Sequence, residues 1–464
     1  MMEDIFNKKC LENALAENRT CESLNRTLGP IGLILLGIGA IIGAGIFVIA
    51  GVASVNTGPA LIISFAIAAI ICVLAALCYA EVSASIPIAG SLYTYAYMTM
   101  GEIWAWLMGW IMMAQYLIIA AVVAIGWSSY VVGFISSLGI CLPAALMGPP
   151  GFNGGLINLP AVMVVLFLTL ILLRGMTGSC QVNALMVFIK VGAVIFFILV
   201  GMTFINPLNY IPFAPFGLSG IALGVALVFF AYNGFDTVAQ AAEETKDPGR
   251  SLPIGIIGSL GICALLYILV AVVMMGMVPF NLLNTASPIG FALQYVGAKW
   301  AFTILSIGAI AGLTSVTLVN LYTNSRTLFA ISRDGLLPKI FSNVSSKSKV
   351  PVFSTLFIGI IATFFAGFFS LSNIFEIVNL VMLISFIVIA ATVILLRKQE
   401  PQLERPFKCP FVPVLPVLLI IISILLILQL NLYVVGTFMI WVLVGVALYF
   451  ILKKYRKNDQ KEVI

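Results

Sequence analysis

Residues 37–47 read Gly37-Ile-Gly-Ala-Ile-Ile-Gly-Ala-Gly-Ile-Phe47, which places four glycines within nine positions of an otherwise apolar stretch. A second apolar stretch is broken in a similar way at residues 229–236, Phe229-Phe-Ala-Tyr-Asn-Gly-Phe-Asp236. Glycine and asparagine are weak helix formers. The two stretches therefore predict two apolar helices that are each interrupted near the middle.

The composition places these helices in a membrane. Hydrophobic residues make up 62% of the 464-residue chain and charged residues only 9%, whereas soluble domains carry about 25% charged residues. The apolar runs are continuous over roughly 20 residues, the length that a helix needs to cross the hydrocarbon core. A strand-built barrel would instead alternate polar and apolar residues. The sequence predicts twelve spans, near residues 31–55, 59–85, 103–137, 157–174, 179–205, 217–243, 252–279, 300–330, 352–370, 373–396, 411–431 and 434–452.

The distribution of basic residues predicts the orientation of these spans. The polar N-terminal segment lacks the apolar stretch and the cleavage site of a signal peptide. If it lies in the cytosol, 23 Lys and Arg residues all fall on the cytosolic side except Lys190, within a span, and Lys299, outside. The positive-inside rule predicts this bias. We therefore expect a multi-pass protein of the plasma or inner membrane with both termini in the cytoplasm.

The interrupted spans are the first and the sixth, so each begins a set of five. A set with an odd number of spans inverts the set that follows it, and broken helices at matching places of inverted halves are typical of a transporter's midplane site. The expected organisation is a cytosolic tail (1–28), a first repeat (29–206), a second repeat (207–397), and two further spans with a cytosolic tail (398–464).

A broken span offers groups that suit a small zwitterion. Amides at the start of a half-helix, together with the helix dipole, favour a carboxylate. Open carbonyls at the facing break would favour an ammonium group. An α-amino acid carries both groups close together. The alternative interpretation is close helix packing through the Gly39 and Gly43 pair, and a nucleotide-binding loop is excluded because it requires a βαβ unit.

Three motifs carry a resemblance to a known family: the glycine run, the span-six break followed by Glu243-Glu244, and the loop Ser332-Arg-Asp-Gly-Leu-Leu-Pro338. Together they resemble the amino acid–polyamine–organocation superfamily, and most closely bacterial members of its cationic amino acid transporter family. The resemblance implies an all-α integral membrane protein with the leucine-transporter fold, five plus five inverted repeats and two extra helices. It implies import of amino acids with Phe230 as an aromatic gate. The substrate-binding residues that we expect are Ile41, Gly43, Ala44, Gly45, Phe230, Ala231, Asn233 and Asn320.

Lys190 is the residue expected to couple transport to protons. It lies within the fifth span, where a charge is costly, and burial disfavours the charged form of a lysine. In proton-coupled proteins that this chain resembles, a lysine of the fifth span contacts the glycine break of span one. Snorkelling of Lys190 to the cytosolic interface is the alternative.

Several further polar residues have open roles. Glu81, Asp236 and Glu243-Glu244 are expected either to relay protons or to form an inner gate. The alternatives are pairing with cytosolic basic residues such as Arg326 or Arg333, or simple exposure at the interface. Gln115 stands where relatives often carry a carboxylate. Asn320 either contacts the substrate side chain or packs against a neighbouring helix, so the preferred amino acid stays open.

Other classes of function fit the sequence less well. The chain has no histidine, which removes histidine-based zinc sites and nucleophile–histidine pairs and disfavours a membrane enzyme. A channel would need a repeated filter or a ring of charges. An amino-acid receptor, an exchanger, a facilitator and a polyamine transporter remain alternatives. We expect an amino acid, protons and the lipid bilayer as partners, and no metal, cofactor, nucleic acid or obligatory protein partner.

Overall fold

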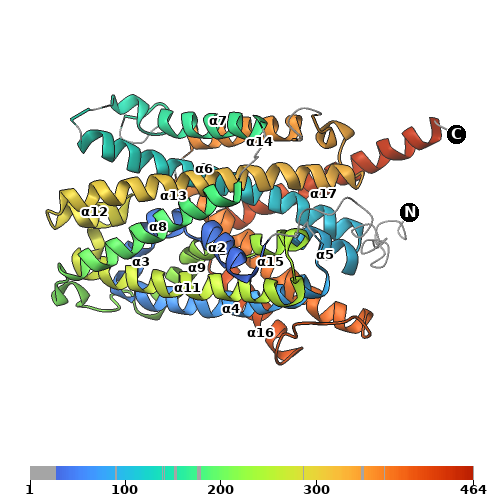
Figure 1. Cartoon of the computed structure of the whole chain (residues 1–464), viewed down its shortest axis with the longest axis horizontal. Coiled ribbons are helices and arrows are strands. Elements are labelled where there is room, and N and C mark those ends of the chain that lie inside the picture. Colours follow the sequence, from blue (N-terminus) through green and yellow to red (C-terminus); the bar gives the residue numbers. More distant parts are fainter. Residues whose placement is uncertain are drawn as a thin grey trace.

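The computed structural model describes residues 28–88, 91–137, 139–140, 142–150, 154–174, 179–285, 287–345, 350–369 and 371–462. Its long helices run side by side along the long axis of the molecule (Figure 1). Regular structure in these residues is helical, and β pairing is limited to two isolated bridges, Leu28 with Thr245 and Met147 with Asn158. The all-helical architecture expected from the sequence is therefore present.

The first half of the chain contains one interrupted helix, one long helix, one short helix and then three more long helices. These elements are α2 (Pro30–Ile41), the π-helix η2 (Gly45–Ile49), α3 (Ala50–Thr57), η3 (Gly58–Ala60), α4 (Leu61–Ser85), α5 (Ser91–Thr99), α6 (Glu102–Ser137), η4 (Ala144–Leu146), α7 (Leu159–Arg174) and α8 (Ser179–Met202).

The second half of the chain also contains one interrupted helix. It contains η5 (Pro207–Tyr210), α9 (Gly217–Val228), the 3₁₀ turn η6 (Phe229–Tyr232), α10 (Thr237–Gln240), η7 (Ala242–Glu244), α11 (Pro248–Met277), η8 (Phe280–Leu282), α12 (Pro288–Tyr295), α13 (Lys299–Arg333), η9 (Lys339–Ser342), α14 (Val352–Phe368), α15 (Leu371–Gln399), α16 (Val414–Ile427) and α17 (Leu432–Glu462).

Length and composition mark the chain as a multi-pass membrane protein. Eight helical segments of the described residues are long and apolar enough to cross a bilayer, and one of them, Pro30–Ser85, runs for 56 residues. Three further apolar helices, α7, α14 and α16, are shorter. Large apolar side chains of α7 and α14, among them Phe167 and Phe364, are exposed on the surface, as expected for helices that face lipid.

Helices of the first half pack against helices of the second half: α4 with α11, α6 with α13, and α7 with α14. Small residues allow close approach, which is how helices associate in membranes. A Cβ atom on Gly359 of α14 would lie 2.4 Å from the Thr169 side chain of α7. The short helices α5 and α12 lie at opposite ends of the molecule, and the end of α17 lies at the same end as α5 (Figure 1).

Main-chain hydrogen bonds also join the start of the first interrupted helix to the end of the second. The Leu28 N–H donates to the Glu244 carbonyl at 3.0 Å, and the Lys246 N–H donates to the Leu28 carbonyl at 3.0 Å. This pairing connects Leu28, which lies just before the N-cap of α2, with the segment that follows α10.

Glu81 of α4 forms a buried ion pair. Its side chain is 1% exposed, and Arg397 at the end of α15 donates to its two oxygens at 2.9 and 2.7 Å. The Cys409 N–H donates to the same carboxylate at 2.7 Å, and Arg405 lies 3.6 Å from it. The expected pairing of Glu81 with a basic residue is present, but its partners are Arg397 and Arg405 rather than Arg326 or Arg333.

We predict that Glu81→Gln lowers the unfolding temperature of the detergent-solubilised protein by several degrees. Removal of one member of a buried ion pair costs about 3–5 kcal/mol. The loss is smaller here, because the Arg397 side chain is 30% exposed and because glutamine keeps some hydrogen bonds. Thermal unfolding followed by tryptophan fluorescence measures the effect. Glu404→Gln, in the exposed connection between α15 and α16, is the matched control. Equal unfolding temperatures for the two variants would contradict the prediction.

Candidate functional site: a cavity between two interrupted helices

The first interruption lies between α2 and η2. The helix α2 ends at Ile41, and Ile42 adopts an extended conformation with φ −72° and ψ 97°. The chain resumes helical structure from Ala44, first as the π-helix η2 and then as α3. The first amides of a helix have no partner within that helix. The helical segment that begins at Ala44 therefore presents N–H groups inside the molecule.

The carbonyl groups at the end of α2 are held by side chains from two other helices. The Lys190 ammonium of α8 donates to the carbonyls of Gly39 and, at 3.0 Å, Ile42. The Tyr267 hydroxyl of α11 donates to the Ile41 carbonyl at 2.9 Å. Lys190 is fully buried, so its side chain ends at the break and does not snorkel to the interface.

The second interruption lies between α9 and α10. The helix α9 tightens into the 3₁₀ turn η6, after which Asn233 is extended with ψ 138°. Gly234 has φ +116°, a conformation that side chains with a Cβ rarely adopt. A Cβ at Gly234 would also lie 2.8 Å from the Ala40 backbone. Glycine is therefore required here both by conformation and by the close approach of α2.

The two interruptions touch each other at a second point. A Cβ on Gly45 would lie 2.1 Å from the Cα of Ala231, and η2 packs directly on η6. The two breaks expected from the sequence are thus both present, and they face each other.

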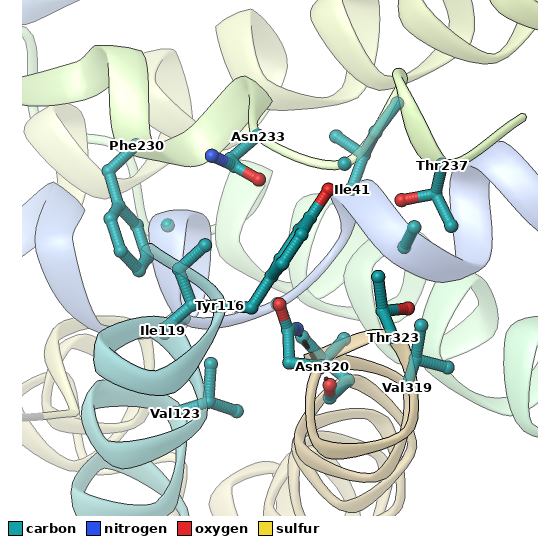
Figure 2. Close-up of a pocket in the computed structure, with 16 residues that line it drawn as sticks. Ile41, Tyr116, Ile119, Val123, Phe230, Asn233, Thr237, Val319, Asn320 and Thr323 are labelled. Carbon is teal, nitrogen blue, oxygen red and sulfur yellow. Dashed lines mark hydrogen bonds between the residues drawn. The ribbon is translucent and has the colours of Figure 1, made fainter. Parts of the chain in front are cut away.

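A cavity opens beside these contacts, and Figure 2 shows its labelled side chains converging from α2, α6, α13 and the span-six break. The space between its lining atoms, including its mouth, is about 420 Å³. Its lining residues are Ala40, Ile41, Gly43, Ala44, Gly45, Tyr116, Ile119, Val123, Phe230, Asn233, Gly234, Thr237, Val316, Val319, Asn320 and Thr323. Small-molecule sites in proteins have this combination of apolar walls and a few polar groups.

Seven of the eight expected binding residues line this cavity: Ile41, Gly43, Ala44, Gly45, Phe230, Asn233 and Asn320. The eighth, Ala231, lies behind the wall against Gly45. Lys190 also lies outside the lining, on the far side of the span-one break. Asn320 donates to the Val316 carbonyl of its own helix at 2.8 Å, so part of the hydrogen-bonding capacity of its amide is used within α13.

Tyr116, Thr237 and Thr323 line the cavity although no motif pointed to them. Tyr116 lies in the middle of the view in Figure 2, between Asn233 and Asn320. Its hydroxyl donates to Asp236 Oδ2 at 3.3 Å and accepts from the Gln240 amide at 3.0 Å. Helical spacing offered a signal, because Tyr116, Ile119 and Val123 of α6 lie at i, i+3 and i+7.

A second cavity lies on the other side of Asn233, with about 280 Å³ between its lining atoms. Gln115 and Asp236 line this second cavity and not the first. Among the described residues that line the first cavity, none carries a charged side chain. A ligand of the first cavity therefore meets amides, hydroxyls, backbone groups and apolar surface.

Comparison with known proteins identifies a family. The family described as amino acid permease matches residues 28–452. The chain is 45% identical to a methylthioribose transporter of Bacillus subtilis, over 97% of this chain and 98% of that protein. It is 43% identical to the branched-chain amino acid permease BcaP of the same organism, over 99% and 100% of the two chains. A vacuolar cationic amino acid transporter of Arabidopsis thaliana is 38% identical over 86% of this chain and 68% of its own length.

We predict that Gly45→Ala strongly lowers the unfolding temperature, because the added methyl group would overlap the Ala231 backbone. Backbone atoms cannot move away as a flexible side chain can, and overpacking costs about 1–3 kcal/mol or more. Thermal unfolding in detergent measures the effect. Gly261→Ala on α11, where a Cβ meets nothing within 4 Å, is the control and should leave the unfolding temperature unchanged or slightly raised, because alanine is the better helix former. A Gly45→Ala protein as stable as this control would contradict the described contact.

Proposed function

The chain belongs to the amino acid permease family, and on that premise we propose that it is a secondary active transporter that imports a neutral amino acid together with a proton. Its relatives are named transporters and permeases, so the chain is a transporter and not an enzyme. The observation that carries the proposal is the cavity bounded by both interrupted helices.

The transported zwitterion is held by backbone groups of the two breaks. The amides at the start of η2, near Gly43 and Gly45, donate hydrogen bonds to the carboxylate, and the helix dipole adds to this attraction. Carbonyls of the η6 turn accept hydrogen bonds from the ammonium group. Phe230 lies at one side of the cavity lining (Figure 2), and its proposed role is that of a gate. The contacts between Gly45 and Ala231 keep the two binding halves at a fixed separation.

The lining favours a neutral substrate side chain. A buried cationic or acidic side chain needs an opposite charge, and the described lining has none. Ile119, Val123, Val316 and Val319 supply apolar surface for a small or branched side chain. This substrate class agrees with the name of the branched-chain permease, one of the relatives that match over the full length.

Proton coupling is assigned to Lys190. A protonated amine forms charge-assisted hydrogen bonds, which are roughly twice as strong as neutral ones, to the carbonyls of Gly39 and Ile42. Loss of the proton weakens the attachment of α2 to α8 and frees α2 to move. Proton and substrate binding to one broken helix are then linked reciprocally.

The proposed topology has twelve spans in two inverted repeats. The 56-residue segment Pro30–Ser85 is roughly 84 Å long at helical rise, enough for two crossings, and the three shorter apolar helices supply the remaining spans. The opposite placement of α5 and α12 (Figure 1) supports the inversion. The basic residues of the connections support an orientation with both termini in the cytoplasm, and the proposed location is the cell membrane.

Methylthioribose is the second candidate substrate. The relative of that name is 45% identical over nearly the whole chain, and the amide and hydroxyl groups of Asn233, Asn320, Thr237 and Thr323 suit sugar hydroxyls. A sugar lacks the carboxylate that the half-helix amides favour, so we rank it second. Exchange or facilitated diffusion of the same amino acid remains the alternative mechanism.

We predict that purified protein in proteoliposomes accumulates neutral amino acids when the outside is acidic. A gradient of one pH unit corresponds to about 1.4 kcal/mol per proton and sustains at most about tenfold accumulation with one proton per substrate. Labelled valine, serine, arginine, glutamate and methylthioribose are compared with and without the gradient. Arginine and glutamate should stay near background. Accumulation of methylthioribose alone would replace the amino acid proposal.

We predict that Lys190→Ala abolishes accumulation driven by the pH gradient, while exchange of labelled for unlabelled substrate persists. Without the ammonium group, the carbonyls of Gly39 and Ile42 lose their titratable partner. Lys190→Met fills the same space and should behave alike. Lys299→Ala, at an exposed lysine, is the control. Uptake by Lys190→Ala at the wild-type rate under the gradient would remove Lys190 from the coupling mechanism.

A further inference from the structure

One face of α15 lies against the span-six break. Asn379, Met382 and Phe386 lie at i, i+3 and i+7, so their side chains lie along the same face of the helix. The α15 helix packs on both α9 and η6. This face is therefore the support behind the half of the binding cavity that span six supplies.

Each of the three residues contacts a different part of the break. The Asn379 amide nitrogen donates to the Leu227 carbonyl, next to last in α9, at 3.3 Å. The sulfur of Met382 accepts from the Asn233 amide at 3.9 Å. The Phe386 ring lies 6.2 Å from that of Phe229 and 6.1 Å from that of Phe235, centroid to centroid. The contacts thus bracket the residues on both sides of the turn.

Asn379 holds a backbone carbonyl at the point where the regular helix ends. The last carbonyls of a helix lack partners within it, and α9 gives way to the tighter turn η6 after Val228. Asn379 is fully buried, and its Oδ1 has no hydrogen-bond partner among the described residues. The bond from its Nδ2 to Leu227 is therefore the polar interaction that this amide contributes.

Lys190 likewise donates to backbone carbonyls at the span-one break. Lys190 lies on α8, the fifth long element of the first half, and Asn379 lies on α15, the fifth of the second half. Each donates to a carbonyl at the end of the first half of an interrupted helix. The two donors differ in chemistry, because lysine can release a proton and asparagine cannot.

We propose that Asn379 is a positioning residue for substrate binding, which fixes the span-six half of the site independently of pH while the span-one half responds to protonation. The proposal rests on the proposed transport function. Asn379 does not line the cavity; it acts through Leu227 and η6 on Phe230 and Asn233. A site held in its binding geometry before the substrate arrives binds more tightly.

The first test is the Michaelis constant for uptake by Asn379→Leu in proteoliposomes. The variant keeps the number and branching of the side-chain heavy atoms and removes the donor. Loss of one hydrogen bond, worth about 0.5–1.5 kcal/mol, should raise KM about two- to tenfold with Vmax per folded transporter unchanged. Thr392→Val removes another buried polar group of α15, one without a partner in the described structure, and should leave KM unchanged. An unchanged KM in Asn379→Leu would overturn the proposal, and so would an equal rise in Thr392→Val.

The second test is Asn379→Asp, assayed at equal pH on both sides of the membrane. A protonated carboxyl donates to the Leu227 carbonyl, whereas an ionised one repels it. The ratio of variant KM to wild-type KM at the same pH should therefore reach one in acid, whatever its value at neutral pH. A ratio that stays raised in acid would overturn the donor role. Failure of the Asn379 proposal can be distinguished from failure of the proposed transport function. In the second case, the wild-type protein itself would accumulate no amino acid.

Discussion

The structure depends on one constraint: a helix can be interrupted inside a bilayer only if the backbone groups that the interruption releases find other partners. At the span-one break, those partners are Lys190 and Tyr267. At the span-six break, Asn379 contributes. The substrate is proposed to use the groups that these side chains leave open. The stability of the fold and the proposed substrate binding therefore both depend on the backbone groups at the two breaks. For this reason, helices that contact the breaks influence the site even where they do not line the cavity.

Local features could be predicted from the sequence. The apolar runs predicted most long helices to within a few residues, although α17 continues to Glu462, beyond the predicted end at residue 452. The glycines of span one and Asn233-Gly234 of span six predicted where the helices would be interrupted. The motif resemblance to the amino acid transporter superfamily is confirmed by the match over residues 28–452. These features are predictable because a span, a break and a motif are each encoded in a short stretch of chain.

Contacts between distant segments could not be predicted in the same way. Glu81 pairs with Arg397 across 316 positions of sequence, and no local pattern distinguishes Arg397 from Arg326. Ala231 was expected in the lining because its neighbours are there, but the turn of η6 directs it toward Gly45. No local motif marks Tyr116, and the rotation of α6 decides that Tyr116 lines the first cavity while the preceding residue, Gln115, lines the second. Rotations of helices about their own axes are settled by packing.

The pairing of Leu28 with the segment after α10 has a consequence for sequence variation. Both hydrogen bonds involve only main-chain atoms, so they persist under almost any exchange of side chains at positions 28 and 246. Proline is the exception, since it has no N–H to donate. Homologues are thus free to diversify at position 246, which is exposed. Position 28 is restricted to apolar side chains, because Leu28 is 9% exposed and packs in the hydrophobic core. At both positions proline should be absent, since it would remove one of the main-chain bonds that join the ends of the interrupted helices.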